Sequence, residues 1–134
     1  MRDILLTLRA CRIPATPQRM AVAEWVLRTT AHPCADEVWE AIQRTLPTVS
    51  RATVYNTLNL FVRKGLLRTQ VLKGGTVVFD PRVEPHHHFI DEETGRIYDV
   101  PWNAVRVTGA GLLRGFRVRE YQVVMRGRRR RRTP

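Results

Sequence analysis

Three of the chain's four histidines stand in one run, at positions 86–88. Side chains two residues apart in an extended segment point to the same face, so His86 and His88 form a chelating pair if this segment is a strand. His87 then points to the opposite face, where we expect it to meet solvent. The alternative is a polar strand with three solvent-exposed histidines and no metal.

Aspartates lie on either side of this run, and the fourth histidine lies far upstream. Imidazole nitrogen and carboxylate oxygen together suit borderline divalent cations. If the chain folds back on itself, these groups converge on one ion. The candidate metal ligands are His32, Asp80, His86, His88 and Asp99.

The same ligands would suit a zinc- or iron-dependent hydrolase, which also needs an open coordination position and a positioned base. The chain has no HExxH sequence and no obvious base. We therefore expect a binding protein and not an enzyme.

A second group of polar residues follows helical spacing between Ser50, a suitable N-cap, and Gly65, a suitable C-cap. One face of this helix is polar and carries Arg51, Tyr55, Asn59 and Arg63, and the opposite face carries Val54, Leu58, Phe61 and Val62. Arginine, tyrosine and asparagine reach base edges and phosphates in a major groove. The pattern predicts a DNA-reading helix. The alternative is an amphipathic helix whose polar face is only solvated.

The neighbouring elements predict a winged helix-turn-helix domain over residues 1–80. Helical patterns cover residues 4–10, a stretch that opens with Thr16 as N-cap, and a stretch from His32 to Pro47. After the reading helix, strand-like runs at 67–72 and 76–79 form a hairpin. Lys73, at its tip, is expected to contact the DNA backbone.

Pro81 and Pro85 bracket a predicted hinge over residues 81–85. Beyond it, the pattern predicts strands at 88–90 and 96–100, a weak helix at 103–113 and a strand at 116–125. A sheet this small needs another surface to pack on, and homodimerisation is the simplest solution. The predicted fold class is therefore α/β: an N-terminal winged helix-turn-helix domain and a small C-terminal α/β domain for dimerisation and metal sensing over residues 86–127, followed by a basic tail at 128–134.

The chain has 134 residues and a formal net charge of +11, and six of its 23 basic residues are arginines between Arg126 and Arg132. This charge favours a nucleic-acid partner, here double-stranded DNA. Sequence-indifferent binding of nucleic acid through the arginine tail is an alternative. Cys11 and Cys34 form no disulfide framework. The absence of a long apolar run or signal peptide predicts a cytoplasmic protein with no membrane partner.

Over nearly its whole length, the chain resembles the ferric uptake regulator family. Six segments occur in family order: residues 16–19 (TPQR), 32–36 (HPCAD), 50–58 (SRATVYNTL), 74–80 (GGTVVFD), 86–89 (HHHF) and 115–118 (GFRV). The resemblance implies a dimeric repressor that binds operator DNA when its regulatory site holds one divalent ion per subunit, which can be Fe(II), Mn(II) or Zn(II). The five candidate ligands fall where the family keeps its regulatory ligands.

The resemblance also places Tyr55 on the family's base-contacting tyrosine and Arg19 near residues that approach the minor groove. The expected DNA-binding residues are Arg19, Arg51, Tyr55, Asn56, Asn59 and Lys73. Asn56 and Asp99 resemble the peroxide-sensing branch, in which bound Fe(II) reacts with hydrogen peroxide and ligand histidines are oxidised. An iron- or haem-status regulator of the same family is the alternative, because residues 86–88 resemble a haem-contacting stretch.

The chain departs from the family at its structural zinc site, which uses two CxxC pairs. Asp91 and Thr94 replace the first pair, and the second would fall in the arginine tail. We therefore expect no structural zinc. An accessory metal site is also doubtful, because Tyr121 stands where a histidine ligand is usual.

Overall fold

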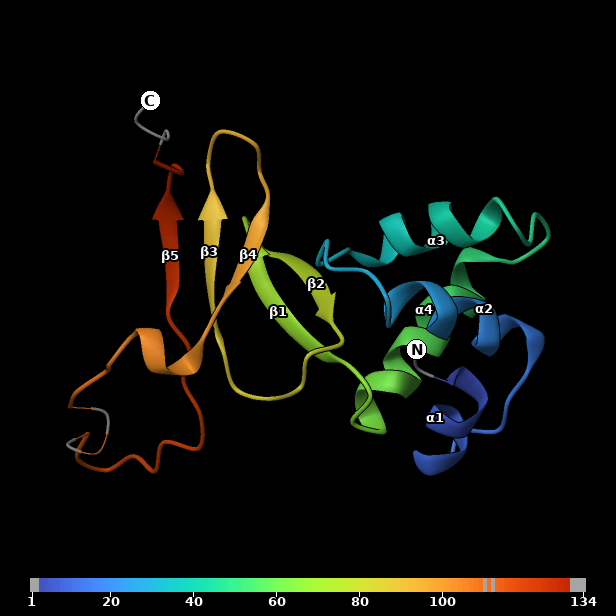
Figure 1. Ribbon diagram of the computed structural model, residues 1–134. Helices are drawn as coiled ribbons and strands as arrows, with labels where there is room; N and C mark the ends of the chain where they lie inside the picture. Colours follow the sequence, from blue (N-terminus) through green and yellow to red (C-terminus); the bar gives the residue numbers. More distant parts are fainter. Residues whose placement is uncertain (1–2, 110, 112, 131–134) are drawn as a thin grey trace. The chain divides into compact units, whose positions relative to one another are not determined.

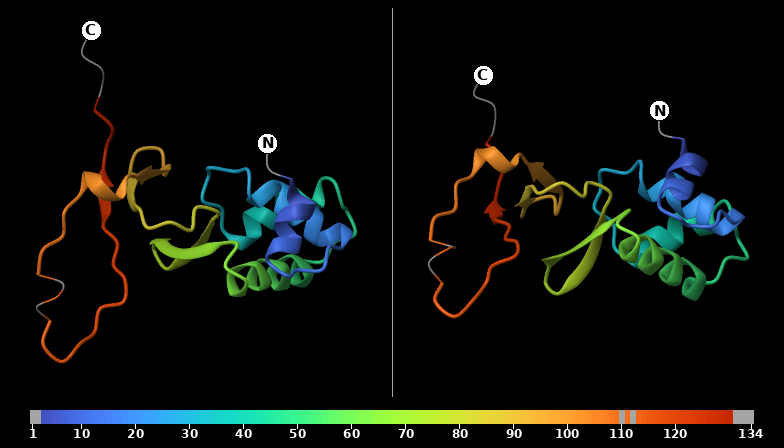
Figure 2. Two further views of the ribbon diagram at one scale, coloured as in Figure 1. Left: turned by 60° about the horizontal axis from the view of Figure 1, so that its bottom comes forward. Right: turned by 90° about the horizontal axis from the view of Figure 1, so that it is seen from below.

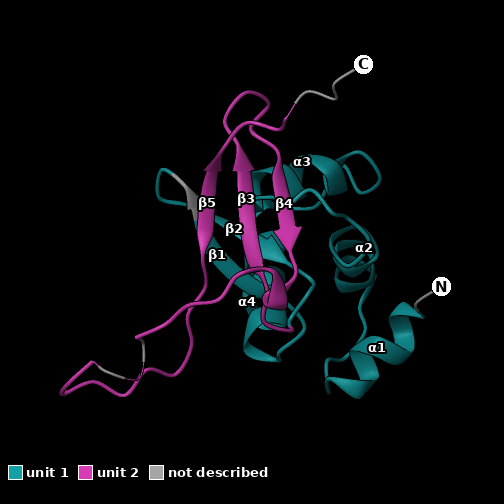
Figure 3. Ribbon diagram, turned by 60° about the vertical axis from the view of Figure 1, so that its left-hand side comes forward, with its two compact units in different colours: residues 1–83 teal, residues 84–134 magenta. Residues whose placement is uncertain are grey.

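The structure is a computed structural model that describes residues 3–109, 111 and 113–130. The chain divides into two compact units, residues 1–83 and residues 84–134 (Figure 3). The expected mixture of helices and sheet is confirmed. The hinge at 81–85 and the finer domain limits stay predictions.

Unit 1 contains four helices followed by a hairpin (Figure 1). The helices are α1 (Ile4–Ala10), α2 (Pro17–Val26), α3 (Ala35–Gln43) and α4 (Arg51–Arg63), and the strands are β1 (Arg68–Lys73) and β2 (Thr76–Asp80). β1 and β2 are antiparallel, with an irregularity between Val71 and Lys73. This order of elements is that of a winged helix-turn-helix, as predicted.

The helices of unit 1 begin at residues whose side chains satisfy free backbone N–H groups. The Thr16 hydroxyl accepts a hydrogen bond from the N–H of Arg19 at 3.2 Å, and Pro17 occupies the first helical position. The Ser50 hydroxyl accepts one from the N–H of Thr53 at 3.0 Å. Both expected N-caps are confirmed.

The C-terminal end of α4 is closed by the backbone of the glycine that follows it. Gly65 has a φ of +78°, a left-handed conformation that favours glycine. The N–H of Leu66 donates to the carbonyl of Phe61 at 2.8 Å, and the N–H of Gly65 donates to that of Val62 at 3.1 Å. These two bonds satisfy carbonyls that the helix leaves free and turn the chain towards β1.

One apolar core holds the four helices together. The inner face of α4 contributes Val54, Leu58 and Phe61, whose exposed fraction is 0%. Val62, also expected on this face, is half-buried and packs against the core. The rest of the core includes Ile4, Leu8, Ile13, Val22, Ala23, Val26, Val38, Ile42, Leu66, Leu67 and Phe79. Burial of one face therefore fixes which side of α4 meets solvent.

Unit 2 is built on a three-stranded sheet in the order β4-β3-β5. Its elements are β3 (His87–Asp91), β4 (Ile97–Val100), the short 3-10 helix η1 (Trp102–Ala104) and β5 (Val124–Gly127). β3 is central, antiparallel to β4 and parallel to β5. His88 lies directly opposite Asp99 of β4 and Val124 of β5.

The connection between η1 and β5 corrects two expectations. Among its described residues between 105 and 123 there is neither an α-helix nor a strand, so the predicted helix at 103–113 is wrong and the last strand begins only at Val124 (Figure 2). Leu113 and Phe116 are 55% and 79% exposed. Short helices depend on tertiary packing of an apolar face, and these side chains are not buried within the chain.

No helix in the described part of the chain is both long and apolar enough to cross a membrane.

Loss of the α4 cap is expected to weaken unit 1. Ser50→Ala removes the acceptor for the Thr53 N–H, so the free energy of unfolding should fall by about 1 kcal/mol. Denaturation in urea, followed by circular dichroism, measures the change. Thr48→Ala, at an exposed position just before the cap, is the matched control and should stay within about 0.5 kcal/mol of the original protein. Equal effects of the two substitutions would contradict the capping role.

Candidate metal centre and DNA-reading helix

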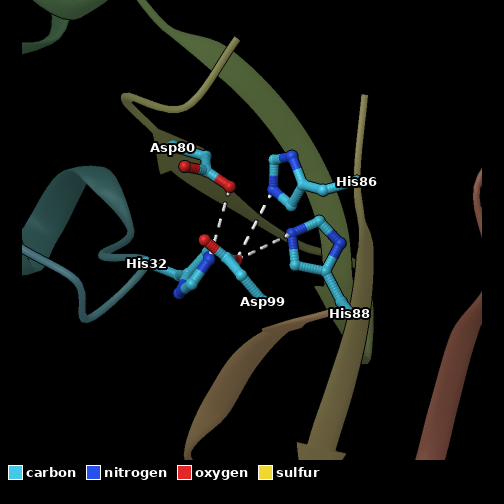
Figure 4. A group of neighbouring side chains, drawn as sticks. All are labelled: His32, Asp80, His86, His88 and Asp99. Carbon is cyan, nitrogen blue, oxygen red and sulfur yellow. Dashed lines mark ion pairs between the residues drawn. The ribbon is translucent and has the colours of Figure 1, made fainter. Parts of the chain in front are cut away.

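In unit 1, the segment before α3 is fastened to strand β2. The N–H of Phe79 donates to the carbonyl of Pro33 at 2.8 Å, and Cys34 forms an isolated bridge with Val78. This pairing brings His32 next to Asp80, the last residue of β2. The His32 Nε2 atom lies 3.3 Å from Asp80 Oδ2, and both side chains are buried (Figure 4). Two potential metal ligands far apart in sequence therefore meet.

His32 has a φ of +52°, in the left-handed region. A side chain with a Cβ atom reaches this region at a cost of roughly 1 kcal/mol or more. Surrounding structure must hold such a residue in place, and strain of this kind clusters at ligand-binding sites. The backbone conformation of His32 is thus consistent with a residue selected for what its side chain binds.

In unit 2, the register of β3 against β4 brings Asp99 to the two flanking histidines of the run. Asp99 Oδ1 lies 3.5 Å from His86 Nε2 and 3.6 Å from His88 Nε2 (Figure 4). The ligand atoms of these three residues all lie within 4.8 Å of one another. The predicted same-face arrangement of His86 and His88 is confirmed by their shared neighbour.

The outer nitrogen atoms of both imidazoles face hydrogen-bond acceptors. His86 Nδ1 lies 2.7 Å from the carbonyl of Glu84, and His88 Nδ1 lies 3.1 Å from the side-chain oxygen of Gln122. An Nδ1–H that donates to oxygen leaves the Nε2 lone pair available for a cation. Two such lone pairs and one carboxylate oxygen form a donor set that fits a borderline divalent ion.

His87 corrects the expectation of a solvent-facing side chain, because its exposed fraction is 0%. Its ring stacks on Trp102 of η1 at 4.6 Å between centroids. Its Nδ1 atom accepts a hydrogen bond from the N–H of Val123 at 3.0 Å, so the proton of the neutral ring is on Nε2. Among the described residues, that Nε2 atom is buried without a hydrogen-bond partner.

The turn between β3 and β4 follows Asp91 and contains Thr94, the two positions where the sequence resemblance places the first cysteine pair. Asp91 Oδ1 accepts hydrogen bonds from the N–H groups of Glu93 at 2.9 Å and Thr94 at 3.4 Å. Burial opposes ionisation of Asp91, but these hydrogen bonds outweigh it and lower the pKa of the carboxyl group. Hydrogen bonds to the Asp91 carboxylate thus hold this turn. The expected lack of structural zinc stays a prediction.

The predicted DNA-reading residues of α4 lie on its solvent side. Arg51, Asn56 and Asn59 are exposed and Tyr55 is half-buried. The Tyr55 hydroxyl donates a hydrogen bond to Asp36 of α3, and Arg51 forms an ion pair with the same carboxylate. Asp36 was not expected at this surface, since no spacing rule links two different helices.

The structure brings Arg19 and Asn56 to one cavity of about 360 Å³ in unit 1. The cavity is lined by Thr16, Gln18, Arg19, Thr53, Asn56, Thr57, Leu60 and Arg63. Arg19 also donates to the carbonyl of Pro14 at 2.8 Å. The backbone of Lys73 ends β1, but its side chain lies outside the described part of the structure.

Cys34, although close to His32, has the character of a packing residue. It is half-buried as the N-cap of α3, and its N–H donates to the Glu37 carboxylate at 3.0 Å. Burial is the main reason that the pKa of its thiol is raised above the ordinary value. A raised thiol pKa reduces the thiolate that redox chemistry requires.

The arginine tail begins on the surface of unit 2. Arg129 lies over the ring of Tyr98 at 5.5 Å, and Arg96 lies over the same ring at 5.0 Å. Arg128 and Arg130 are exposed. The remaining tail residues, 131–134, lie outside the described residues.

Residues 11–126 match the family model described as the ferric uptake regulator family. The chain belongs to this family. It is therefore a metal-dependent transcriptional regulator and not an enzyme.

Two comparisons connect this regulator to proteins named for peroxide. It is 31% identical to the peroxide operon regulator of Bacillus subtilis (strain 168), with 95% of this chain and 89% of the relative aligned. It also resembles the crystal structure of the Campylobacter jejuni peroxide stress regulator, with a TM-score of 0.66 and 26% identity over 98% of this chain and 100% of that one.

A third comparison concerns the fold. The structure of the ferric uptake regulator from Pseudomonas aeruginosa with manganese has a TM-score of 0.69 and 22% identity, over 97% of this chain and 100% of that one. These neighbours confirm the winged-helix and dimerisation-domain fold class.

Because the His87 side chain is fully buried, we expect it to stabilise unit 2. His87→Leu should lower the free energy of unfolding in the presence of a chelator by about 1–3 kcal/mol, because the Val123 N–H loses its acceptor. Urea denaturation with Trp fluorescence measures this change. Glu93→Ala, an exposed residue beside the same sheet, should leave stability nearly unchanged. An equally small effect at His87 would support the solvent-facing alternative.

Proposed function

We propose that this regulator is a repressor that binds operator DNA as a homodimer when each subunit holds one divalent metal ion. The observation that carries the proposal is the cluster in unit 2, where two imidazole Nε2 atoms and one carboxylate oxygen come together. The buried pair of His32 and Asp80 in unit 1 completes the proposed ligand set. The family resemblance of all five positions supports this assignment.

The ligand chemistry narrows the metal to a few ions. The proposed ligands offer only nitrogen and oxygen, which suits Fe(II), Mn(II) and Zn(II). The related Pseudomonas protein was solved with manganese, and another neighbour is a zinc-bound manganese uptake regulator. Availability in the cell would then decide which ion is bound, because affinity alone follows a fixed order among these metals.

Metal binding is proposed to control DNA binding through the geometry of the dimer. An ion that takes ligands from both units would fix the angle between them, and with it the spacing of the two α4 helices. Half-sites separated by whole helical turns accept only one such spacing. Arg51, Tyr55, Asn56 and Asn59 would then meet base edges and phosphates, and Arg19 and Lys73 would meet the DNA beside them.

We infer that hydrogen peroxide is the signal. The Bacillus and Campylobacter relatives are named as peroxide regulators, and Asp99 and Asn56 resemble that branch. If the site held Fe(II), the ion would supply one electron to hydrogen peroxide. The O–O bond would break to give hydroxide and a hydroxyl radical beside the ligand imidazoles, and the iron would become Fe(III). His32 and His86 are the proposed points of attack. The radical would add to a ring carbon, and loss of one electron to Fe(III) and of one proton would leave one added oxygen on the ring, which would then no longer hold the metal.

Removal of the chelating pair should abolish metal control of DNA binding. The operator is first obtained by selection from a random DNA pool with the wild-type protein and Mn(II). The double variant His86→Ala/His88→Ala should then bind this duplex with the same low affinity in Mn(II) and in chelator. Only three of the five proposed ligands remain, which is too few to hold the ion. Glu92→Ala/Glu93→Ala, in the adjacent turn, serves as the control. Wild-type affinity of the double histidine variant in Mn(II) would contradict the proposal.

Peroxide should inactivate only the iron form. After treatment with hydrogen peroxide, mass spectrometry should show one added oxygen on a peptide containing His32 or His86 in the Fe(II) form, together with loss of DNA binding. The Mn(II) form should show neither change. Asp99→Glu should lower the peroxide sensitivity and leave metal-dependent binding largely intact. Equal oxidation with both metals, or none with iron, would instead favour a regulator of iron or haem status, which a haem absorbance titration would then test.

A further inference from the structure

Asp36 joins two residues of the DNA-reading surface from a different helix. It lies in the first turn of α3, and its carboxylate accepts the hydrogen bond of the Tyr55 hydroxyl. The same oxygen lies 3.3 Å from Arg51 Nη1. Tyr55 and Arg51 are one turn apart on α4, so one carboxylate fixes two neighbouring side chains of the polar face.

Helix capping does not account for this arrangement. The N–H of Cys34 is bonded by Glu37, so capping of α3 uses the next carboxylate along the chain. An acidic residue in the first turn is also stabilised by the helix dipole, but this effect does not require contact with α4. The direction of the Asp36 side chain towards α4 therefore needs another explanation.

Arg51 is held from a second direction as well. Its guanidinium carbon lies 4.7 Å from the centre of the Trp39 ring, and Trp39 is one turn after Asp36 on the same helix. The Arg51 and Asp36 side chains are 56% and 52% exposed, so this ion pair contributes little to stability. A charged pair of little structural value at the proposed DNA surface points to a role in recognition.

We propose that Asp36 is a specificity-determining residue of the DNA-reading surface, which positions Tyr55 and Arg51 and opposes sequence-independent binding. This inference rests on the proposed function. The aspartate reads no base itself and acts through the two side chains that it holds. Its negative charge also faces the polyanion, so each non-specific encounter meets a carboxylate beside the cationic group.

The hydrogen bond decides what the Tyr55 hydroxyl offers to DNA. A phenol has one proton, and Tyr55 gives it to Asp36, so its oxygen presents only acceptor lone pairs. That hydrogen bond is the main reason that the pKa of Tyr55 is raised, which keeps the proton in place. An acceptor oxygen suits the amino group of adenine or cytosine in the major groove, and the ring edge suits the thymine methyl group.

The ion pair limits the use of Arg51 as a general phosphate ligand. Arginine that contacts phosphate gives affinity without sequence information. While Asp36 holds Arg51, contact with a phosphate requires that this pairing be given up. A cognate site, where Tyr55 also finds its base, compensates for this cost better than a random site does.

The test compares Asp36→Asn with Glu40→Gln in the full-length, Mn(II)-saturated protein. Both substitutions remove one negative charge from α3, and Glu40 is exposed one turn further along the helix. Dissociation constants are measured by fluorescence anisotropy for the selected duplex and for a random duplex of equal length, at several salt concentrations. Circular dichroism and the unfolding midpoint verify that each variant is folded.

Asp36→Asn should tighten binding to random DNA several-fold, because Arg51 is released from its ion pair. The slope of log K against log salt concentration should become steeper by about one, the value expected for one additional phosphate contact. Binding to the selected duplex should weaken by about twofold, so the ratio of the two affinities should fall by about tenfold. Glu40→Gln should shift both duplexes alike and leave this ratio unchanged. Asp36→Glu, which keeps the negative charge, should retain part of the discrimination that Asp36→Asn loses.

Tyr55→Phe supplies a second measurement. In this background the hydroxyl is already missing, so Asp36→Asn should reduce discrimination by a smaller factor than in the original protein. The role of Asp36 would be overturned if Asp36→Asn and Glu40→Gln gave the same ratio of affinities for the selected and random duplexes. It would also be overturned if Asp36→Asn reduced this ratio as much in the Tyr55→Phe background as in the original protein while the salt slope stayed unchanged. Failure of the proposed function would be visible earlier, as an absence of discrimination by the wild-type protein.

Discussion

The pleat of strand β3 is the constraint on which the chemistry of unit 2 depends. Successive side chains of a strand point to opposite faces, and this alternation divides the histidine run into two roles. His86 and His88 share one face with Asp99, whereas His87 turns the other way and is enclosed by Trp102 and the backbone of Val123. A shift of one residue in the register would exchange the two faces and separate the proposed ligand pair from Asp99.

Helix α4 also has two different faces, but its side chains repeat every 3.6 residues and not every two as in a strand. The apolar face is fully buried and cannot rotate without exposing Val54, Leu58 and Phe61. The polar face is thereby directed to solvent, and the closing bonds at Gly65 direct the chain into the hairpin. Core packing thus sets the orientation of the proposed DNA-reading residues, and contacts across the surface adjust their side chains.

Residues that depart from the family pattern are accommodated by local chemistry. Where two cysteines would bind zinc, Asp91 accepts backbone hydrogen bonds within a turn. This replacement stabilises the turn but adds no covalent link to distant parts of the chain. The apolar side chains exposed between η1 and β5, Leu113 and Phe116 among them, offer one surface for the proposed dimer contact.

The sequence by itself determined the order of helices and hairpin in unit 1, the N-caps at Thr16 and Ser50, and the pairing of His86 with His88. These features follow from local rules, since caps, helical periods and strand alternation involve residues only a few positions apart. The sequence also determined family membership, because its motifs extend over nearly the whole chain.

Tertiary structure alone decided the features that join distant segments. The burial of His87 depends on Trp102 and on Val123, which is 36 residues away, so no local sequence pattern predicts it. The hydrogen bond between Tyr55 and Asp36 links two helices through side chains, and its sequence separation of 19 residues follows no period. The expected helix at 103–113 failed for the complementary reason. A weak helical pattern needs another surface to bury its apolar side chains, and Leu113 stays exposed.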